Sequence, residues 1–313
     1  MTGENRTRFL PTLPPHKEEK SGNVTVVASG NANVPGLASR PFLWYTARKG
    51  GIRLRLSTVV KRTLLTLGAP LRHLQGHPAP QVEHIPIYIQ GLPAAFSGYR
   101  IAVVADLHLP HSLSSPQQVA DAVQDAAPDC IFIAGDLANR YAHFDKDGID
   151  AFLAALTAIA PCVAVIGNHE RGVYRENYRA AMQKAGIPLM ENRFETLERG
   201  GQTLPVYGVG YPPKTVTATD VPALLLLHHP EDAAAFKSAG FSLAVCGHAH
   251  GGQIGLGKRG LYAPGQGFFP QYVSGLYTVG DMALVVSRGL GDSSLSLRLH
   301  NPPHLPVLTL YGK

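Results

Sequence analysis

Short runs of apolar residues recur along the chain from about residue 83 onward and predict buried strands. Runs of four or five apolar residues without polar alternation are typical of strands that are covered on both faces. The run at 83–89 contains Pro86, which favours the edge of a sheet. The expected strands are 83–89, 101–105, 130–134, 162–166, 206–209, 224–227, 243–246, 272–279, 282–287 and 305–310.

Helical patterns separate the earlier strands. A helix is predicted from Ser115-Pro116, because proline favours the first turn. Two more are predicted at 148–160, stopped by Pro161, and at 174–185, closed by Gly186. Later strands follow one another as hairpins. This order predicts an α/β fold, a four-layer α/β/β/α sandwich of two mixed sheets with flanking helices, over residues 81–313.

The first 80 residues have a different character. Residues 1–39 are polar and rich in Pro and Gly, and we expect a disordered or loosely attached arm. Residues 40–80 form a basic helical segment, in which 40–72 hold eight Lys/Arg and no acid, against a net charge of +6 for the chain. Its amphipathic pattern at 41–72 suits either peripheral contact with an anionic membrane or packing on the domain.

Composition narrows the class of protein. No apolar run reaches 18 residues and no secretion signal is visible, so we expect neither a transmembrane helix nor export. The three cysteines, Cys130, Cys162 and Cys246, lie in apolar runs and predict buried free thiols in a reducing compartment. Since the basic residues gather in one segment, no nucleic-acid partner is expected. A cytoplasmic protein, peripheral on the inner face of the membrane, fits this pattern.

Polar residues with metal-binding side chains follow five of the predicted strands. In α/β sheets, ligands bind beyond the carboxyl ends of the strands, so these side chains should converge. The donors are only nitrogen and oxygen, which suits Mn, Fe or Zn. Even without His169, seven ligands are too many for one tetrahedral ion and suit two ions. The residues are Asp106 and His108, Asp136, Asn168 and His169, His228, and His248 and His250.

These motifs, in this order, resemble the signature of the calcineurin-like metallophosphoesterase superfamily. Two further stretches, 251–253 and 287–291, resemble its bacterial YkuE-like branch. The motifs are Asp106-Leu107-His108, Gly135-Asp136, Gly167-Asn168-His169-Glu170, His228 and Gly247-His248-Ala249-His250.

The resemblance implies a role for each of these residues. Asp106, His108 and His250 would bind a first divalent metal ion, with Mn favoured. Asn168, His228 and His248 would bind a second, and Asp136 would bridge the two. His169 would be a catalytic residue near the leaving group rather than a ligand. Asn139 departs from the pattern, since many relatives carry an acid there.

Several residues keep two interpretations. His228 directly follows its strand and is favoured over His229 as the ligand. Arg288 is either a substrate-binding residue that grips phosphate or half of a surface ion pair. Glu170 is expected to be a structural hydrogen-bonding partner. The aromatic residues Tyr262, Phe268, Phe269 and Tyr272 suit either an acyl chain or ordinary loop packing.

A pair of divalent ions can activate water near neutral pH and neutralise charge on phosphoryl oxygens. The sequence therefore predicts a metal-dependent phosphoesterase, a phosphodiesterase or pyrophosphohydrolase. The resemblance implies one candidate, a lipid-linked substrate of the UDP-diacylglucosamine type, since some relatives cleave that compound. The alternatives are a soluble nucleotide phosphodiesterase and a non-catalytic scaffold with the same fold.

Overall fold

A computed structural model describes residues 77–214, 216, 222–253, 255–256, 259–263, 266–292, 298 and 300–313. The predicted arm at 1–39 and nearly all of the basic segment at 40–80 lie outside these residues, so both stay predictions. Among the described residues, no helix has the length and apolar character needed to span a membrane.

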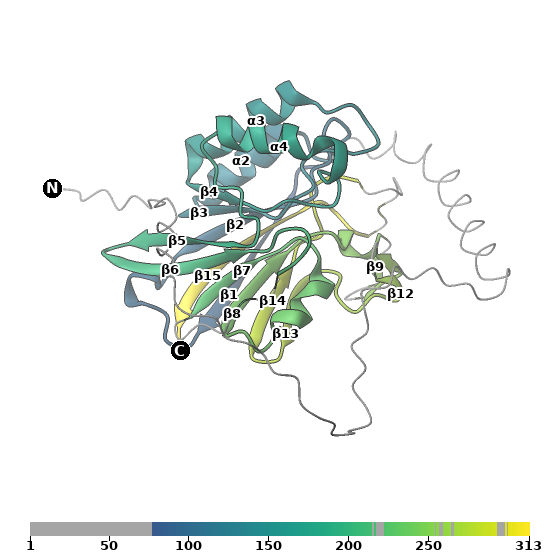
Figure 1. Cartoon of the computed structure of the whole chain (residues 1–313). Helices are drawn as coiled ribbons and strands as arrows, with labels where there is room; N and C mark the ends of the chain where they lie inside the picture. Colours follow the sequence, from purple (N-terminus) through teal and green to yellow (C-terminus); the bar gives the residue numbers. More distant parts are fainter. Residues whose placement is uncertain are drawn as a thin grey trace, which may run out of the picture.

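Two large mixed sheets lie face to face (Figure 1). The first has the order β1-β15-β2-β3-β4, and β2, β3 and β4 are parallel. Its edge strand β1 contains Pro86, as predicted. The strands of this sheet are β1 (Gln81–Ile89), β2 (Arg100–Val104), β3 (Cys130–Ile133), β4 (Cys162–Ala164) and β15 (His304–Gly312).

The second sheet has the order β13-β14-β8-β7-β6-β5. Its central strands β14, β8, β7 and β6 are parallel, and antiparallel strands form its two edges. The strands are β5 (Arg193–Arg199), β6 (Gln202–Gly208), β7 (Ala223–Leu226), β8 (Phe241–Cys246), β13 (Gly275–Val279) and β14 (Met282–Val286).

Three helices cover the outer face of the first sheet, α2 (Pro116–Ala126), α3 (Lys146–Ile159) and α4 (Arg175–Lys184) (Figure 1). Ser115 starts α2 with a reciprocal capping box to Gln118, and such pairs satisfy the free N–H groups of a first turn. Gly186, in the left-handed conformation with φ +68°, follows α4 as predicted.

Short 3₁₀ helices and two small hairpins complete the described chain. The helix η3 packs on the outer face of the second sheet, and the other short elements lie in the loops. They are η1 (Ala94–Phe96), η2 (Gly172–Tyr174), η3 (Pro230–Phe236), η4 (His250–Gly252), β9 (Gly255–Leu256), β10 (Arg259–Gly260), β11 (Tyr262–Ala263) and β12 (Gly267–Phe268).

Alternate residues of the central strands face two different cores. Val103 and Phe132 lie between the sheets, where they join Leu226 and Val245 of the second sheet. Ala102 and Ile131 face the helices. Because both faces are buried, the strands are continuously apolar. The predicted sandwich of two mixed sheets with flanking helices is confirmed, and so are the buried free thiols.

Candidate metal centre

The polar residues that follow the parallel strands lie at the carboxyl ends of both sheets. Asp106 follows β2, Asp136 follows β3 and Asn168 follows β4; His228 follows β7 and His248 follows β8. Strands β2, β3 and β4 are parallel to one another, and so are β6, β7 and β8. Their carboxyl ends therefore lie at the same end of each sheet. The predicted convergence therefore arises from the strand directions of the two facing sheets.

Local backbone geometry turns these side chains inward. Five site residues, none of them glycine, adopt the left-handed conformation with positive φ. This conformation is costly for residues with a Cβ and is found mainly at functional sites. The five are Asp106 (φ 53°), His108 (φ 58°), Asp136 (φ 56°), His248 (φ 68°) and His250 (φ 47°).

A first group of ligands surrounds His108. Its Nε2 lies 3.2 Å from Nε2 of His250, which in turn lies 3.7 Å from Oδ1 of Asp106. Two nitrogens bound to one ion at about 2.0–2.1 Å lie roughly 3.0–3.4 Å apart, so the two imidazoles are spaced as ligands of one cation. The ligand atoms of Asp106, His108 and His250 all lie within 4.8 Å of one another.

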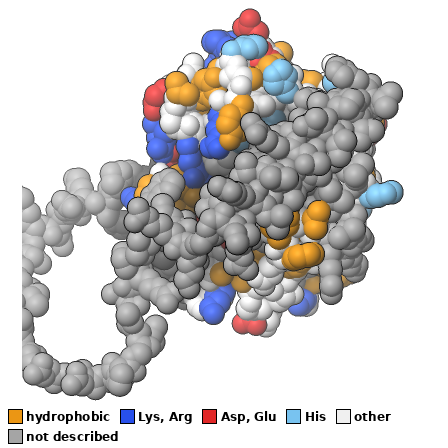
Figure 2. All heavy atoms as spheres, turned by 90° about the vertical axis from the view of Figure 1, so that its right-hand side faces the viewer, with side chains coloured by type: hydrophobic (Ala, Val, Ile, Leu, Met, Phe, Trp, Pro, Cys, Tyr) orange, Lys and Arg blue, Asp and Glu red, His pale blue; other side chains and the backbone are white. Residues whose placement is uncertain are grey.

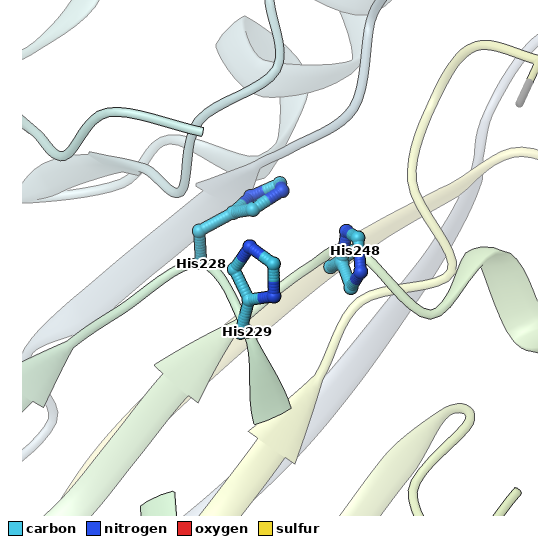
Figure 3. Close-up of side chains that lie close together, drawn as sticks. All are labelled: His228, His229 and His248. Carbon is cyan, nitrogen blue, oxygen red and sulfur yellow. The ribbon is translucent and has the colours of Figure 1, made fainter. Parts of the chain in front are cut away.

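A second group surrounds His228. Its Nε2 lies 3.0 Å from Oδ1 of Asn168 and 3.3 Å from Oδ2 of Asp136. Its Nδ1 donates to the carbonyl oxygen of Ala134 at 2.8 Å, which directs Nε2 toward the other ligand atoms. The ring of His248 lies 4.9 Å from that of His228, measured between centroids (Figure 3).

Asp136 lies between the two groups. Its Oδ2 is 3.3 Å from Nε2 of His228 and 3.9 Å from Nε2 of His108. Its other oxygen accepts a hydrogen bond from the backbone N–H of His169 at 2.7 Å, which fixes the carboxylate. This placement suits a bridging ligand shared by two cations.

His229 occupies a different environment from His228. Its Nε2 lies 2.8 Å from Nη2 of Arg171, and a guanidinium nitrogen there can only donate a hydrogen bond. The lone pair of Nε2 is therefore engaged by a cation. His229 does lie with His228 and His248 in one group of nitrogen atoms (Figure 3). The contacts with Asn168 and Asp136 nevertheless favour His228 as the ligand, as the sequence suggested.

Burial shifts the pKa values of the ligand side chains. Burial raises the pKa of Asp106 to about 7, with Asp136 adding to the effect. Burial lowers the pKa of His108 to about 3. Burial also opposes a charge on His228, but Asp136 outweighs it and raises the pKa of that imidazole to about 9. A proton on His228 thus supplies positive charge that divalent ions would supply when bound. The donor set fits two such ions, because carboxylate and amide oxygens and neutral imidazole nitrogens are ligands of divalent metals and form two groups joined at Asp136.

His169 lies beside the ligands with its ring 4.3 Å from that of His108. Its Nδ1 accepts a hydrogen bond from the backbone N–H of Arg140 at 3.3 Å. Burial lowers its pKa, so the neutral ring carries its hydrogen on Nε2. That hydrogen can be donated to an oxygen atom at the site without any change of protonation state.

Glu170 has the structural role that was expected. Its carboxylate accepts hydrogen bonds from the backbone N–H groups of Asp136, Ala138 and Gly167 at 2.9–3.0 Å. These bonds tie the loop after β3 to the loop after β4. Glu170 therefore keeps Asp136 in position.

Arg288 points away from the ligands. Its Nη2 donates to Oε1 of Gln81 at 2.8 Å, and its Nη1 lies 3.8 Å from Oε2 of Glu83. These contacts on β1 correspond to the ion-pair interpretation rather than to the predicted grip on phosphate. In the surrounding motif, residues 287–291, the residue that contacts the site is Gly289. A Cβ at this position would lie 2.6 Å from Cβ of Asp106.

Two arginines near the ligands were not predicted. Nη2 of the buried Arg298 lies 3.0 Å from Nδ1 of His250, and Arg171 contacts His229 as described. The ligands were predicted from their positions directly after apolar strands, and neither arginine has such a position. Arg171 is only two residues beyond His169, and that proximity was the one available hint.

Comparison of the sequence with known proteins identifies its family. Residues 99–252 match the family model of the calcineurin-like phosphoesterases. The chain is 28% identical over 256 residues to metallophosphoesterase YkuE of Bacillus subtilis, covering 76% of this chain and 88% of the relative. It is 30% identical over 233 residues to phosphodiesterase YaeI of Escherichia coli, covering 68% and 82% respectively.

A shorter match, 29% identical over 129 residues, is to the UDP-2,3-diacylglucosamine pyrophosphatase LpxG of Chlamydia trachomatis, and it covers 40% of this chain and 38% of that protein. The chain belongs to the calcineurin-like phosphoesterase family, and its similarity to YkuE confirms the predicted branch. Membership of this family supports a phosphoester hydrolase that depends on divalent metal ions, for which the Asp and His groups are available.

Proposed function

We propose that this protein hydrolyses a phosphodiester or pyrophosphate bond in a lipid-linked substrate, with two divalent cations at the centre described above. Asp106, His108 and His250 would hold one cation, and Asn168, His228 and His248 the other, with Asp136 shared. Mn is the first metal to test. The observation that supports this proposal most is that two separate ligand groups, buried except for the half-buried Asn168, meet at the carboxylate of Asp136.

The bound ions would activate water and offset charge on the phosphoryl oxygens. The chain itself supplies a hydrogen-bond donor, Nε2 of His169, 4.0 Å from Oδ2 of Asp136. A donor there can stabilise negative charge that develops on the leaving oxygen. All the predicted ligands are present and gathered, which argues against the non-catalytic scaffold.

Two exposed phenylalanines favour a substrate with an apolar part. Phe268 and Phe269 are 49% and 75% exposed. Backbone hydrogen bonds connect their hairpin to the site. The N–H of Phe269 donates to the carbonyl of Leu261, and the N–H of Leu261 donates to the carbonyl of Gly252. Gly252 lies two residues after His250. Phe269 also has a positive φ of 54°, a costly conformation for an aromatic residue.

The surface view turns the side of the molecule that bears β12 toward the reader (Figure 2). Hydrophobic side chains reach the surface there in small patches. Exposed aromatic residues on a hairpin that is hydrogen-bonded to the loop of a polar site suit a ligand with both a charged head and an acyl chain. The relatives named above include one phosphodiesterase and one pyrophosphatase of a diacylated nucleotide sugar, which supports the same class of substrate.

Hydrolysis of bis-p-nitrophenyl phosphate by the Mn-loaded protein tests the catalytic part of the proposal. We expect wild-type protein to release nitrophenol and Asp136→Ala to lose at least about 100-fold in kcat/KM, since a misplaced catalytic group costs of that order. A fully metal-loaded wild-type protein that leaves the diester intact, or an Asp136→Ala variant as active as wild type, would contradict it.

The lipid part is tested with a double variant, Phe268→Ser with Phe269→Ser. We expect it to lose at least about tenfold in kcat/KM on a phosphodiester presented in mixed micelles, because full burial of even one such side chain contributes about 1.5–3 kcal/mol. It should keep wild-type activity on bis-p-nitrophenyl phosphate. Leu276→Ser is the matched control, because Leu276 is 53% exposed on β13. Equal activity of all three proteins on micelles would instead support a soluble nucleotide phosphodiesterase.

A further inference from the structure

Arg171 places a cation beside the second ligand group. It directly precedes η2 and follows the Asn168-His169-Glu170 loop. Its Nη2 lies 2.8 Å from Nε2 of His229, and its guanidinium carbon lies over the ring of Tyr211. Burial lowers its pKa from the usual arginine value, but the group remains cationic at any ordinary pH.

The imidazole of His229 connects Arg171 to the proposed ligands His228 and His248. The ring of His229, which Arg171 contacts, lies 4.0 Å from the ring of His248 and 4.9 Å from that of His228, between centroids (Figure 3). The negative charge of Asp136 also acts on the guanidinium. One side chain, that of His229, thus links Arg171 to the histidines proposed as ligands of the second cation.

A short chain of contacts holds the guanidinium in place. Oε1 of Glu231 lies 3.3 Å from Nδ1 of His229. When Nδ1 carries the hydrogen and donates it to Glu231, Nε2 is left to accept from Arg171. His229 thus orients Arg171 without bringing a carboxylate into contact with it.

No carboxylate oxygen of the described residues forms an ion pair with Arg171 within 4.0 Å, and its buried Nε has no hydrogen-bond partner there. The charges of Asp136 and Asp232 act on the guanidinium from further away. The nearby Arg175 and Arg179 differ, since both form ion pairs with Glu191 at 2.6–2.7 Å. A partly buried cation without an ion-pair partner is costly. An anionic ligand in direct contact would supply the close partner that these more distant carboxylates do not.

We propose that Arg171 binds a second phosphoryl group next to the one held at the cations, so that the preferred substrates are pyrophosphate-linked. This inference rests on the proposed function and selects between its two bond types. A guanidinium offers parallel N–H donors that match the oxygens of a phosphate. A simple phosphodiester has one phosphoryl group and leaves Arg171 unused, whereas a pyrophosphate diester carries a second anionic group.

Calorimetric titration of the Mn-loaded, full-length protein tests this assignment with two probes that differ by one phosphoryl group. The probes are a methylene-bridged, non-hydrolysable analogue of a nucleoside diphosphate and the corresponding nucleoside monophosphate. We expect Arg171→Gln to weaken the first about 10–100-fold, the usual loss for a charge-assisted hydrogen bond, and the second by less than about threefold. The affinity of Arg171→Lys for the bridged probe should fall between those of wild type and Arg171→Gln, since lysine keeps the charge but lacks the parallel N–H donors of the guanidinium.

The matched control is Arg179→Gln, which removes the same charge from a residue 41% exposed at its side chain and paired with Glu191. It should change neither affinity by more than about twofold. Metal content is measured for every variant. Equal weakening of both probes by Arg171→Gln, or no weakening of either, would overturn the assignment.

Absence of tight binding of the bridged probe to the wild-type protein would overturn it as well. None of these results depends on turnover. Failure of this inference is therefore separable from failure of the proposed hydrolysis, which the diester assay measures.

Discussion

Gly167→Ala adds one methyl group at the narrowest point behind the bridging carboxylate. A Cβ on Gly167 would lie 2.8 Å from Cγ of Asp136 and closer still to Oδ1 and the backbone nitrogen of that residue. Carbon atoms in contact are normally about 3.5–4.0 Å apart. The carboxyl group must therefore move by roughly 1 Å, and the backbone nitrogen on the same side prevents a simple rotation.

A shift of this size is expected to act on both folding and chemistry. Overpacking of a tight core costs about 1–3 kcal/mol of unfolding free energy. A misplacement of about 1 Å at a catalytic centre costs of the order of 100-fold in rate. Gly312→Ala is the control, because it adds the same methyl group where no atom lies within 4 Å.

The assay is kcat/KM for bis-p-nitrophenyl phosphate, measured with metal content and the denaturant midpoint for both variants. Gly167→Ala should bind less metal and lose about 100-fold in kcat/KM, whereas Gly312→Ala should match wild type. Retention of full metal content and of activity within about threefold by Gly167→Ala would refute the steric argument.

Three further outcomes are expected. His228→Ala should lose one bound metal ion per chain, whereas His229→Ala should keep its metal content, as measured by inductively coupled plasma mass spectrometry; the reverse result would exchange their roles. Phe132→Ala, in the core between the sheets, should lower the unfolding free energy by about 3–5 kcal/mol in urea titrations, and a loss below about 1 kcal/mol would contradict that packing. Full-length protein should sediment with anionic vesicles more than a variant lacking residues 1–75, and equal sedimentation would remove the membrane role of the basic segment.

The ligands could be predicted because two simple rules coincided. Apolar strands are visible in the sequence, and parallel strands bring their carboxyl ends to one side of a sheet. Asp106, Asp136 and His228 each follow such a strand, so position alone indicated a shared site. The order of the motifs then identified the family, which the comparisons confirmed.

Other features depend on distances that the sequence does not encode locally. The edge strand β5 is rich in polar residues, with Leu197 fully buried within it, so its apolar pattern was too weak to detect. Arg288 was the arginine predicted to bind phosphate, and no role was predicted for Arg171, although both lie close to a site motif. Only the fold shows that Arg288 turns toward Glu83 and Arg171 toward His229.

The central claim is that the two ligand groups hold two cations that share Asp136. Metal content of wild-type protein and of Asp136→Asn, after dialysis against Mn and removal of excess metal, tests it most directly. We predict two Mn ions per wild-type chain and a clear deficit in the variant. A single ion in the wild-type protein, or two ions retained by Asp136→Asn, would contradict the shared centre.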